Sequence, residues 1–154
     1  MIEPGNLSWP DADLDAVRRL RVMAAAIPGT VVVETVIPVS FDAVWAVVSD
    51  LQHEVPRLEW HVRSLRITRR DGDRLEALVT GPIGIRDRFV GVLRPGWCWM
   101  QGRALFIGMA AVPGPEGTLL ALAAGLRIPG AAALRPIVRH DLTSALRHLA
   151  RHAE

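Results

Sequence analysis

Six short β-type segments, joined by tight turns and followed by a long amphipathic helix, constrain the fold of this chain more than any other feature. Turns such as Asp71-Gly72-Asp73 and Pro95-Gly96 leave room only for a reversal of chain direction. Consecutive segments must therefore pair antiparallel, which gives a sheet whose apolar face needs a cover. The six segments are residues 62–70, 74–80, 85–94, 97–101, 104–112 and 118–128.

The sequence before these segments predicts three helices and one more strand. Apolar residues recur at helical spacing over residues 11–27. Residues 30–38 are rich in β-branched side chains and predict a strand. Two short helices are expected next, around residues 44–48 and 51–59.

The final helix begins after Gly130 and has one apolar side, which suits it to cover the sheet. Its apolar stripe consists of Leu134, Val138, Leu142, Ala145, Leu146 and Leu149.

The composition predicts one domain and argues against a nucleic-acid partner. The 154 residues, 50% of them hydrophobic, suffice for a substantial core. All 18 basic side chains are arginine, and Lys and Tyr are absent. Almost nothing therefore titrates between neutral pH and the arginine range, so the sequence pI of about 9.8 reflects a net charge of only +2. A nucleic-acid partner would require a clustered basic face rather than this small surplus.

The single cysteine and the apolar segments bear on the location of the protein. Cys98 excludes an intramolecular disulfide and any Cys-rich zinc site, and it favours a cytoplasmic setting. Residues 1–5 lack the features of a secretory signal. Residues 104–126 are the one candidate for a membrane span, but the Pro/Gly-rich run at 113–117 interrupts them. We expect no integral membrane segment.

Two of the β-type segments are apolar on both faces. Residues 105–112 and 119–126 lack the alternation of a strand that faces water on one side. Something must cover their outer face. Either the helix over 11–27 packs there, or two chains associate through this surface as a homodimer.

Several motifs within residues 30–152 point to a known fold. They are the strand at 31–38 with the helix at 40–50 directly after it, the Arg94-Pro95-Gly96-Trp97 turn, Gly117-Thr118 before the last strand, and the amphipathic final helix. In these motifs the sequence resembles the START-related superfamily of lipid-transfer and polyketide cyclase/dehydrase-like (SRPBCC) proteins. The resemblance implies an α+β helix-grip fold, in which a curved seven-stranded antiparallel sheet wraps around a long C-terminal helix. Residues 1–29 would form an N-terminal helical extension and residues 30–154 the helix-grip domain.

The resemblance also implies that an apolar cavity between sheet and helix holds a small hydrophobic molecule, such as a lipid or polyketide. We expect transport or sequestration of this ligand; the alternative is a polyketide cyclase, aromatase or dehydratase. Neither function requires a cofactor, and the sequence contains no GxGxxG, P-loop, GxSxG or HExxH motif. The expected lining residues are Phe89, Met100, Leu120, Leu122, Leu126, Val138 and Leu142, with Trp60 near the entrance.

The Pro95-Gly96 turn predicts which side chains of the two adjoining strands share a face. The more apolar face is expected to point inward, and Asp87 would be its one acid, placed for acid/base chemistry. Alternatively, Asp87 lies near the sheet edge and pairs with an arginine. The turn pairs Arg94 with Trp97, Val92 with Trp99, Val90 with Gln101 and Arg88 with Arg103, and it places Asp87, Phe89, Gly91, Leu93, Cys98 and Met100 inside.

The opposite face of these strands carries Trp97, Trp99 and several arginines. They are expected to form an outer ladder of cation–π contacts. A bulge that inverted the register would instead turn them into an aromatic and cationic pocket for a polyoxygenated or anionic ligand.

Two histidine-containing stretches remain as candidates. Residues 53–61 contain two His and two carboxylates without a recognised metal-ligand spacing, so we expect no metal site there. In the family this segment lies near the cavity mouth, so Glu59 or His61 could act as an acid or base. His148 and His152 lie four apart on the last helix, and a solvated helix face is the simpler interpretation.

Overall fold

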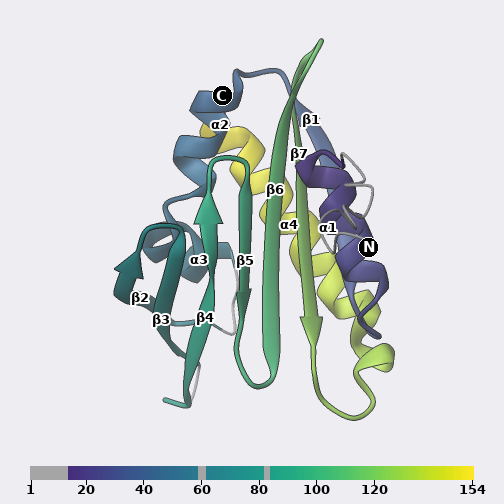
Figure 1. Ribbon diagram of the computed structural model, residues 1–154. Helices are drawn as coiled ribbons and strands as arrows, with labels where there is room; N and C mark the ends of the chain where they lie inside the picture. The colour runs from purple at the N-terminus through teal and green to yellow at the C-terminus, as the bar shows by residue number, and fades with distance from the viewer. Residues whose placement is uncertain (1–13, 59–61, 82–83) are drawn as a thin grey trace, which may run out of the picture.

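The computed structural model describes residues 14–58, 62–81 and 84–154, and these contain one antiparallel sheet of seven strands with helices on both of its faces (Figure 1). The strand order is β1-β7-β6-β5-β4-β3-β2. This confirms the predicted α+β class and the seven-stranded sheet. The strands are β1 (Val31–Ile37), β2 (Ser64–Asp71), β3 (Arg74–Thr80), β4 (Arg86–Arg94), β5 (Trp97–Gln101), β6 (Leu105–Gly114) and β7 (Gly117–Leu126). The helices are α1 (Ala16–Ala25), α2 (Phe41–Val48), α3 (Leu51–Leu58), the 3₁₀ helix η1 (Ala131–Leu134) and α4 (Arg135–Ala153).

The inner face of the sheet packs on α4 and forms the main hydrophobic core (Figure 1). From α4, the core receives Leu142, Ala145, Leu146 and Leu149, four members of the predicted apolar stripe. Helices α2 and α3 contact α4 beside the sheet and enclose one end of this core. The long C-terminal helix is thus the predicted cover.

The outer face of the sheet carries α1, which packs over β6 and β7 in a second hydrophobic cluster. Asp15 caps this helix by accepting a hydrogen bond from the Arg18 N–H at 2.9 Å. Arg21 forms a two-bond ion pair with Glu34 of β1, at 2.9 and 3.0 Å. Helix α1 packs closely on the sheet because β6 and β7 present small residues to it, namely Gly108, Ala110, Ala121 and Ala123. Of the two covers that the sequence allowed for this face, the structure has the N-terminal helix.

The β4–β5 hairpin has the predicted register. Val90 lies opposite Gln101, Val92 opposite Trp99, and Arg94 opposite Trp97. The expected pair of Arg88 and Arg103 is wrong, because the ladder between the two strands ends at Gln101. The inverted register is also wrong: Trp97 and Trp99 lie in the outer cluster with α1.

The apolar stretch at residues 104–126 forms β6 and β7 rather than a helix. In the part of the chain that the structure describes, no helix combines the length and the apolar character that a membrane crossing would require.

Candidate functional site

The space between the sheet and α4 is an apolar chamber that side chains almost fill. It contains a cavity of about 20 Å³, room for about one water molecule. The cavity is lined by Val55, Ile107, Gly108, Met109, Leu122, Ala123, Leu142 and Ala145. A larger ligand would need these side chains to move.

A buried carboxylate and a partly buried imidazole lie at the α3 end of this chamber. Glu54 on α3 is 7% exposed, and its Oε2 atom lies 3.9 Å from Nε2 of His148 on α4. Both atoms are fully buried, and neither forms a hydrogen bond with any residue that the structure describes. The cavity is adjacent, because Val55 follows Glu54 in α3 and Ala145 precedes His148 by less than one turn of α4.

The ring of His152 extends this pair toward the end of α4. Its centroid lies 4.4 Å from that of His148. His152 is exposed, whereas the His148 side chain is only 31% exposed. The interpretation of both residues as a solvated helix face is therefore wrong for His148, since α3 packs against this part of α4.

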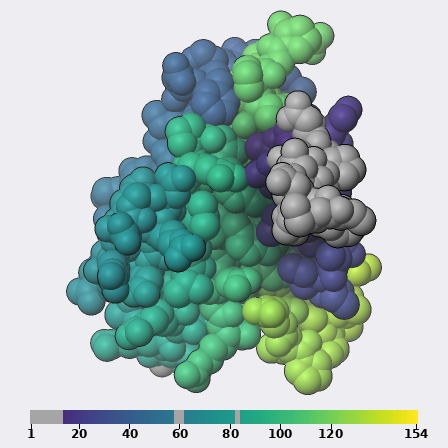
Figure 2. Space-filling model, in the orientation of Figure 1, coloured from purple at the N-terminus to yellow at the C-terminus, as the bar shows by residue number. Residues whose placement is uncertain are grey.

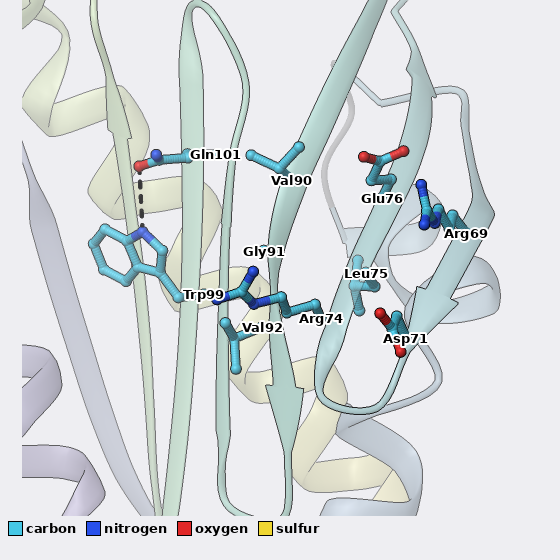
Figure 3. Close-up of a pocket in the computed structure, with 10 residues that line it drawn as sticks. All are labelled: Arg69, Asp71, Arg74, Leu75, Glu76, Val90, Gly91, Val92, Trp99 and Gln101. Atoms are coloured by element: carbon cyan, nitrogen blue, oxygen red, sulfur yellow. Dashed lines mark hydrogen bonds between the residues drawn. The ribbon is translucent and has the colours of Figure 1, made fainter.

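A second hollow lies on the outer face of the sheet, over β2 to β5 (Figure 3). Its volume is about 520 Å³, within the range of small-molecule sites. Valines of β4 form its floor, with the indole of Trp99 on one side and the β2–β3 hairpin on the other (Figure 3). The residues around it, which we call the outer groove, are Arg69, Asp71, Arg74, Leu75, Glu76, Val90, Gly91, Val92, Trp99 and Gln101.

Comparison with solved structures decides the fold. The protein TTHA0849 from Thermus thermophilus has a TM-score of 0.58 at 22% identity, covering 80% of this chain and 96% of that one. The ZhuI aromatase/cyclase from Streptomyces sp. R1128 has a TM-score of 0.61 at 14% identity, covering 80% and 92%. Norcoclaurine synthase from Thalictrum flavum, with a transition-state analogue bound, has a TM-score of 0.56 at 15% identity, covering 80% and 92%. The chain has the helix-grip fold. No protein-family profile and no curated protein sequence matches it.

Seven of the eight predicted lining residues of the helix-grip chamber lie on or beside its inner core, and the eighth, Trp60, lies outside the described residues. Phe89, Met100, Leu120, Leu122 and Leu142 are buried there. Only Leu122 and Leu142 of these reach the small cavity. The other two are less enclosed: Val138 packs at the margin of the core, and Leu126 is half-buried at the end of β7. Glu59, Trp60 and His61 lie outside the described residues.

Asp87 lies at the beginning of β4, near one end of the inner face. It is partly exposed, and its Oδ2 atom accepts a hydrogen bond from the backbone N–H of Arg103 at 2.8 Å. Gly102 makes this bond possible, since a side chain there would collide with Asp87 and Phe89. Asp87 therefore holds the loop after β5, and its partner is the Arg103 backbone rather than a guanidinium.

The remaining candidates have structural partners or lie apart from one another. His53 is exposed, with its Nδ1 2.9 Å from Oδ1 of Asp50. Cys98 is buried on the inner face, and this burial raises the pKa of its thiol from 9.0 to about 12. The arginine over the Trp97 ring is Arg19 of α1, at 5.8 Å, rather than a strand arginine. Within residues 14–58, 62–81 and 84–154, no three His, Cys, Asp or Glu side chains are grouped to hold a metal ion.

Proposed function

We propose that this chain binds a small hydrophobic molecule that carries a hydroxyl group, with its apolar body between the sheet and α4. The observation that carries the proposal is the pair of Glu54 Oε2 and His148 Nε2, buried 3.9 Å apart and without hydrogen bonds to the described residues. Buried polar atoms in proteins almost always have a bonding partner. A hydroxyl is both donor and acceptor, so it can bond to the carboxylate and to the imidazole at once.

The chamber has to widen for such a ligand. A cavity of about 20 Å³ is far smaller than a typical small-molecule site. Met109 lines the cavity and Met100 lies in the same core, and methionine side chains adapt readily to new shapes. Burial of apolar ligand surface, at about 25 cal/mol per Å², would offset the cost of this rearrangement. The transition-state analogue in norcoclaurine synthase supports the capacity of the fold to hold a small organic molecule.

Calorimetric titration with 2-naphthol tests the proposal, with naphthalene as the matched compound without a hydroxyl. We expect the protein to bind 2-naphthol, and Glu54→Met to weaken this binding about tenfold or more, because a hydrogen bond to a charged group is lost. Binding of naphthalene is expected to be unaffected by this substitution. Glu116→Met, in the exposed β6–β7 turn, is the control variant. Failure of 2-naphthol to bind, or equal binding by the Glu54→Met variant, would contradict the proposal.

The same substitution is expected to stabilise the protein in the absence of any added compound. Glu54 places a polar atom in the core without a bond, and such atoms cost roughly 1–3 kcal/mol. Methionine of similar length removes this cost, but it also loses the favourable position of a carboxylate in the first turn of α3. We expect the free energy of unfolding in urea to rise by about 1 kcal/mol. A fall would show that the Glu54 carboxylate stabilises the fold.

A second function, proton transfer in a cyclase- or dehydratase-like reaction, is supported by the same two side chains. A neutral imidazole can take a proton from an enolisable carbon, and a neighbouring carboxylate then stabilises the imidazolium. The two functions differ in the effect of His148→Gln on a 1,3-diketone substrate. If the protein is an acid/base enzyme, His148→Gln would retain substrate binding and lose turnover. If it is a binding protein, neither the wild-type protein nor His148→Gln would turn the substrate over.

A further inference from the structure

Helix α1 covers only part of the outer face of the sheet. It lies over β6 and β7 and reaches Trp97 at the near end of β5. No other described residue covers the hollow over β2, β3, β4 and the Trp99–Gln101 end of β5 (Figure 1). Trp99 lies at the boundary between the covered and the open part of this face. Its ring and Leu20 of α1 both lie next to Gly108, where an added side chain would meet both of them. In Figure 2 the surface is hollowed over the green strands, between the teal β2–β3 hairpin and the purple α1.

Strand register builds the outer groove from two adjacent rows of residues. Both rows begin with charged residues on β2 and β3, continue with a valine on β4, and reach Trp99 or Gln101 on β5. One row is Asp71, Arg74, Val92 and Trp99, and the other is Arg69, Glu76, Val90 and Gln101. The groove therefore has a charged end, an apolar floor and an aromatic end.

The aromatic end offers a rigid indole, held between Trp97 and Phe106, and its N–H donor. The Trp99 ring is fixed by stacking on Phe106, with centroids 5.0 Å apart and planes at 18°. Its indole N–H donates a hydrogen bond of 3.5 Å to Gln101 Oε1, which is long for such a bond. An acceptor atom of a ligand could replace Gln101 at little cost.

The charged end favours an anion. The guanidinium of Arg74 extends across the floor toward Trp99, and Arg69 lies on the opposite side (Figure 3). Neither arginine forms an ion pair with an acid in the described part of the chain, unlike Arg21 with Glu34. Three more exposed arginines flank the two rows on the same face, namely Arg66, Arg88 and Arg94. Arginines on and around the groove therefore outnumber its two acids, Asp71 and Glu76.

We propose that the outer groove is a second ligand site, which takes a planar aromatic molecule with a carboxylate or a similar anionic group. The ring would lie over Val90 and Val92 beside Trp99, and the anion would bind the guanidinium groups of Arg74 and Arg69. Arginine suits this role because its planar fork bonds a carboxylate through two parallel N–H groups. The site lies on the opposite side of the sheet from the Glu54–His148 pair and is independent of it.

Titration of ¹⁵N-labelled protein with 2-naphthoate, followed by NMR, tests this site. We expect the indole N–H signal of Trp99 to shift, with its assignment taken from Trp99→Phe. Arg69→Gln/Arg74→Gln is expected to weaken binding at least about tenfold, whereas Arg135→Gln/Arg139→Gln, exposed on α4 and equal in charge, is expected to bind normally. The neutral 2-naphthamide is expected to bind the wild-type protein at least about tenfold more weakly.

Three results would overturn the proposal: no shift of the Trp99 indole signal, equal affinity for the amide, or normal binding by Arg69→Gln/Arg74→Gln. Glu54→Met separates the two sites, since it is expected to leave 2-naphthoate binding unchanged. Loss of 2-naphthoate binding in that variant would place the compound in the inner chamber instead.

Discussion

A chain that begins at Gly29 is expected to aggregate or to unfold at room temperature, because it lacks α1. Val17 and Leu20 of this helix are 1% and 0% exposed. Without them the outer cluster around Trp97 and Ala121 would face water, a continuous apolar patch of the kind that drives association. Replacement of one buried leucine by alanine typically costs about 2–5 kcal/mol, a large part of the roughly 5–15 kcal/mol that stabilises a domain.

Light scattering and urea unfolding measure this effect. Leu20→Ala in the full chain is expected to lower the free energy of unfolding by about 3 kcal/mol. Val22→Ala, on the exposed side of the same helix at 58% exposure, is expected to change it by less than about 0.5 kcal/mol. A chain that begins at Leu14 retains α1 and serves as the control for shortening. If the chain from Gly29 stayed monomeric and equally stable, α1 would contribute nothing to the fold.

The arrangement of the sheet was predictable because its signals are local. The Pro95-Gly96 turn determines the β4–β5 register within two residues, so the inner and outer faces follow at once. The missing alternation in β6 and β7 likewise predicted a cover on the outer face, and α1 supplies it. In both cases the prediction depends only on residues that are close together in the sequence.

The Glu54–His148 pair was not predictable in this way. The two residues are far apart in the sequence, and they meet only because α3 packs across α4. The sequence around Glu54 contains two other acids and two histidines within residues 50–61, and nothing in their spacing shows which of them turns inward. The near-complete filling of the chamber has a similar cause, since it depends on how all the core side chains interlock.

The outer groove could not be predicted from the sequence because a β-bulge in β2 changes which residues face outward. The β2–β3 register shifts between Ile67 and Arg69, where Thr68 is the extra residue. Simple alternation would have placed Thr68 and Arg70 on the outer face. The bulge places Arg69 and Asp71 there instead, opposite Glu76 and Arg74. Of the aromatic and cationic residues that the sequence suggested for a pocket, only Trp99 lines the groove. The sequence linked that pocket to an inverted register, which the groove does not need.

The free energy of unfolding is expected to fall steeply between pH 9 and pH 11, because of Cys98 alone. Burial raises the pKa of this thiol from 9.0 in an exposed chain to about 12 in the folded protein. In this interval the unfolded chain loses the thiol proton while the folded chain keeps it, so higher pH favours unfolding. The stabilising effect is complete below pH 9 and is lost as the pH approaches 12. The slope is about 1.4 kcal/mol per pH unit, or roughly 3 kcal/mol by pH 11.

This alkaline transition can be assigned to one residue because the chain contains no Lys and no Tyr, whose side chains titrate in the same range in most proteins. Urea unfolding at pH 8, 9, 10 and 11 gives the slope for the wild-type protein and for Cys98→Ala. The alanine variant lacks the ionisable thiol, so its free energy of unfolding is expected to stay nearly constant over these values. Its absolute stability can differ because the sulfur is lost, and for this reason the slopes are compared. Parallel slopes in the two proteins would mean that Cys98 ionises as readily in the folded chain as in the unfolded one, and that β5 does not hold it in the core.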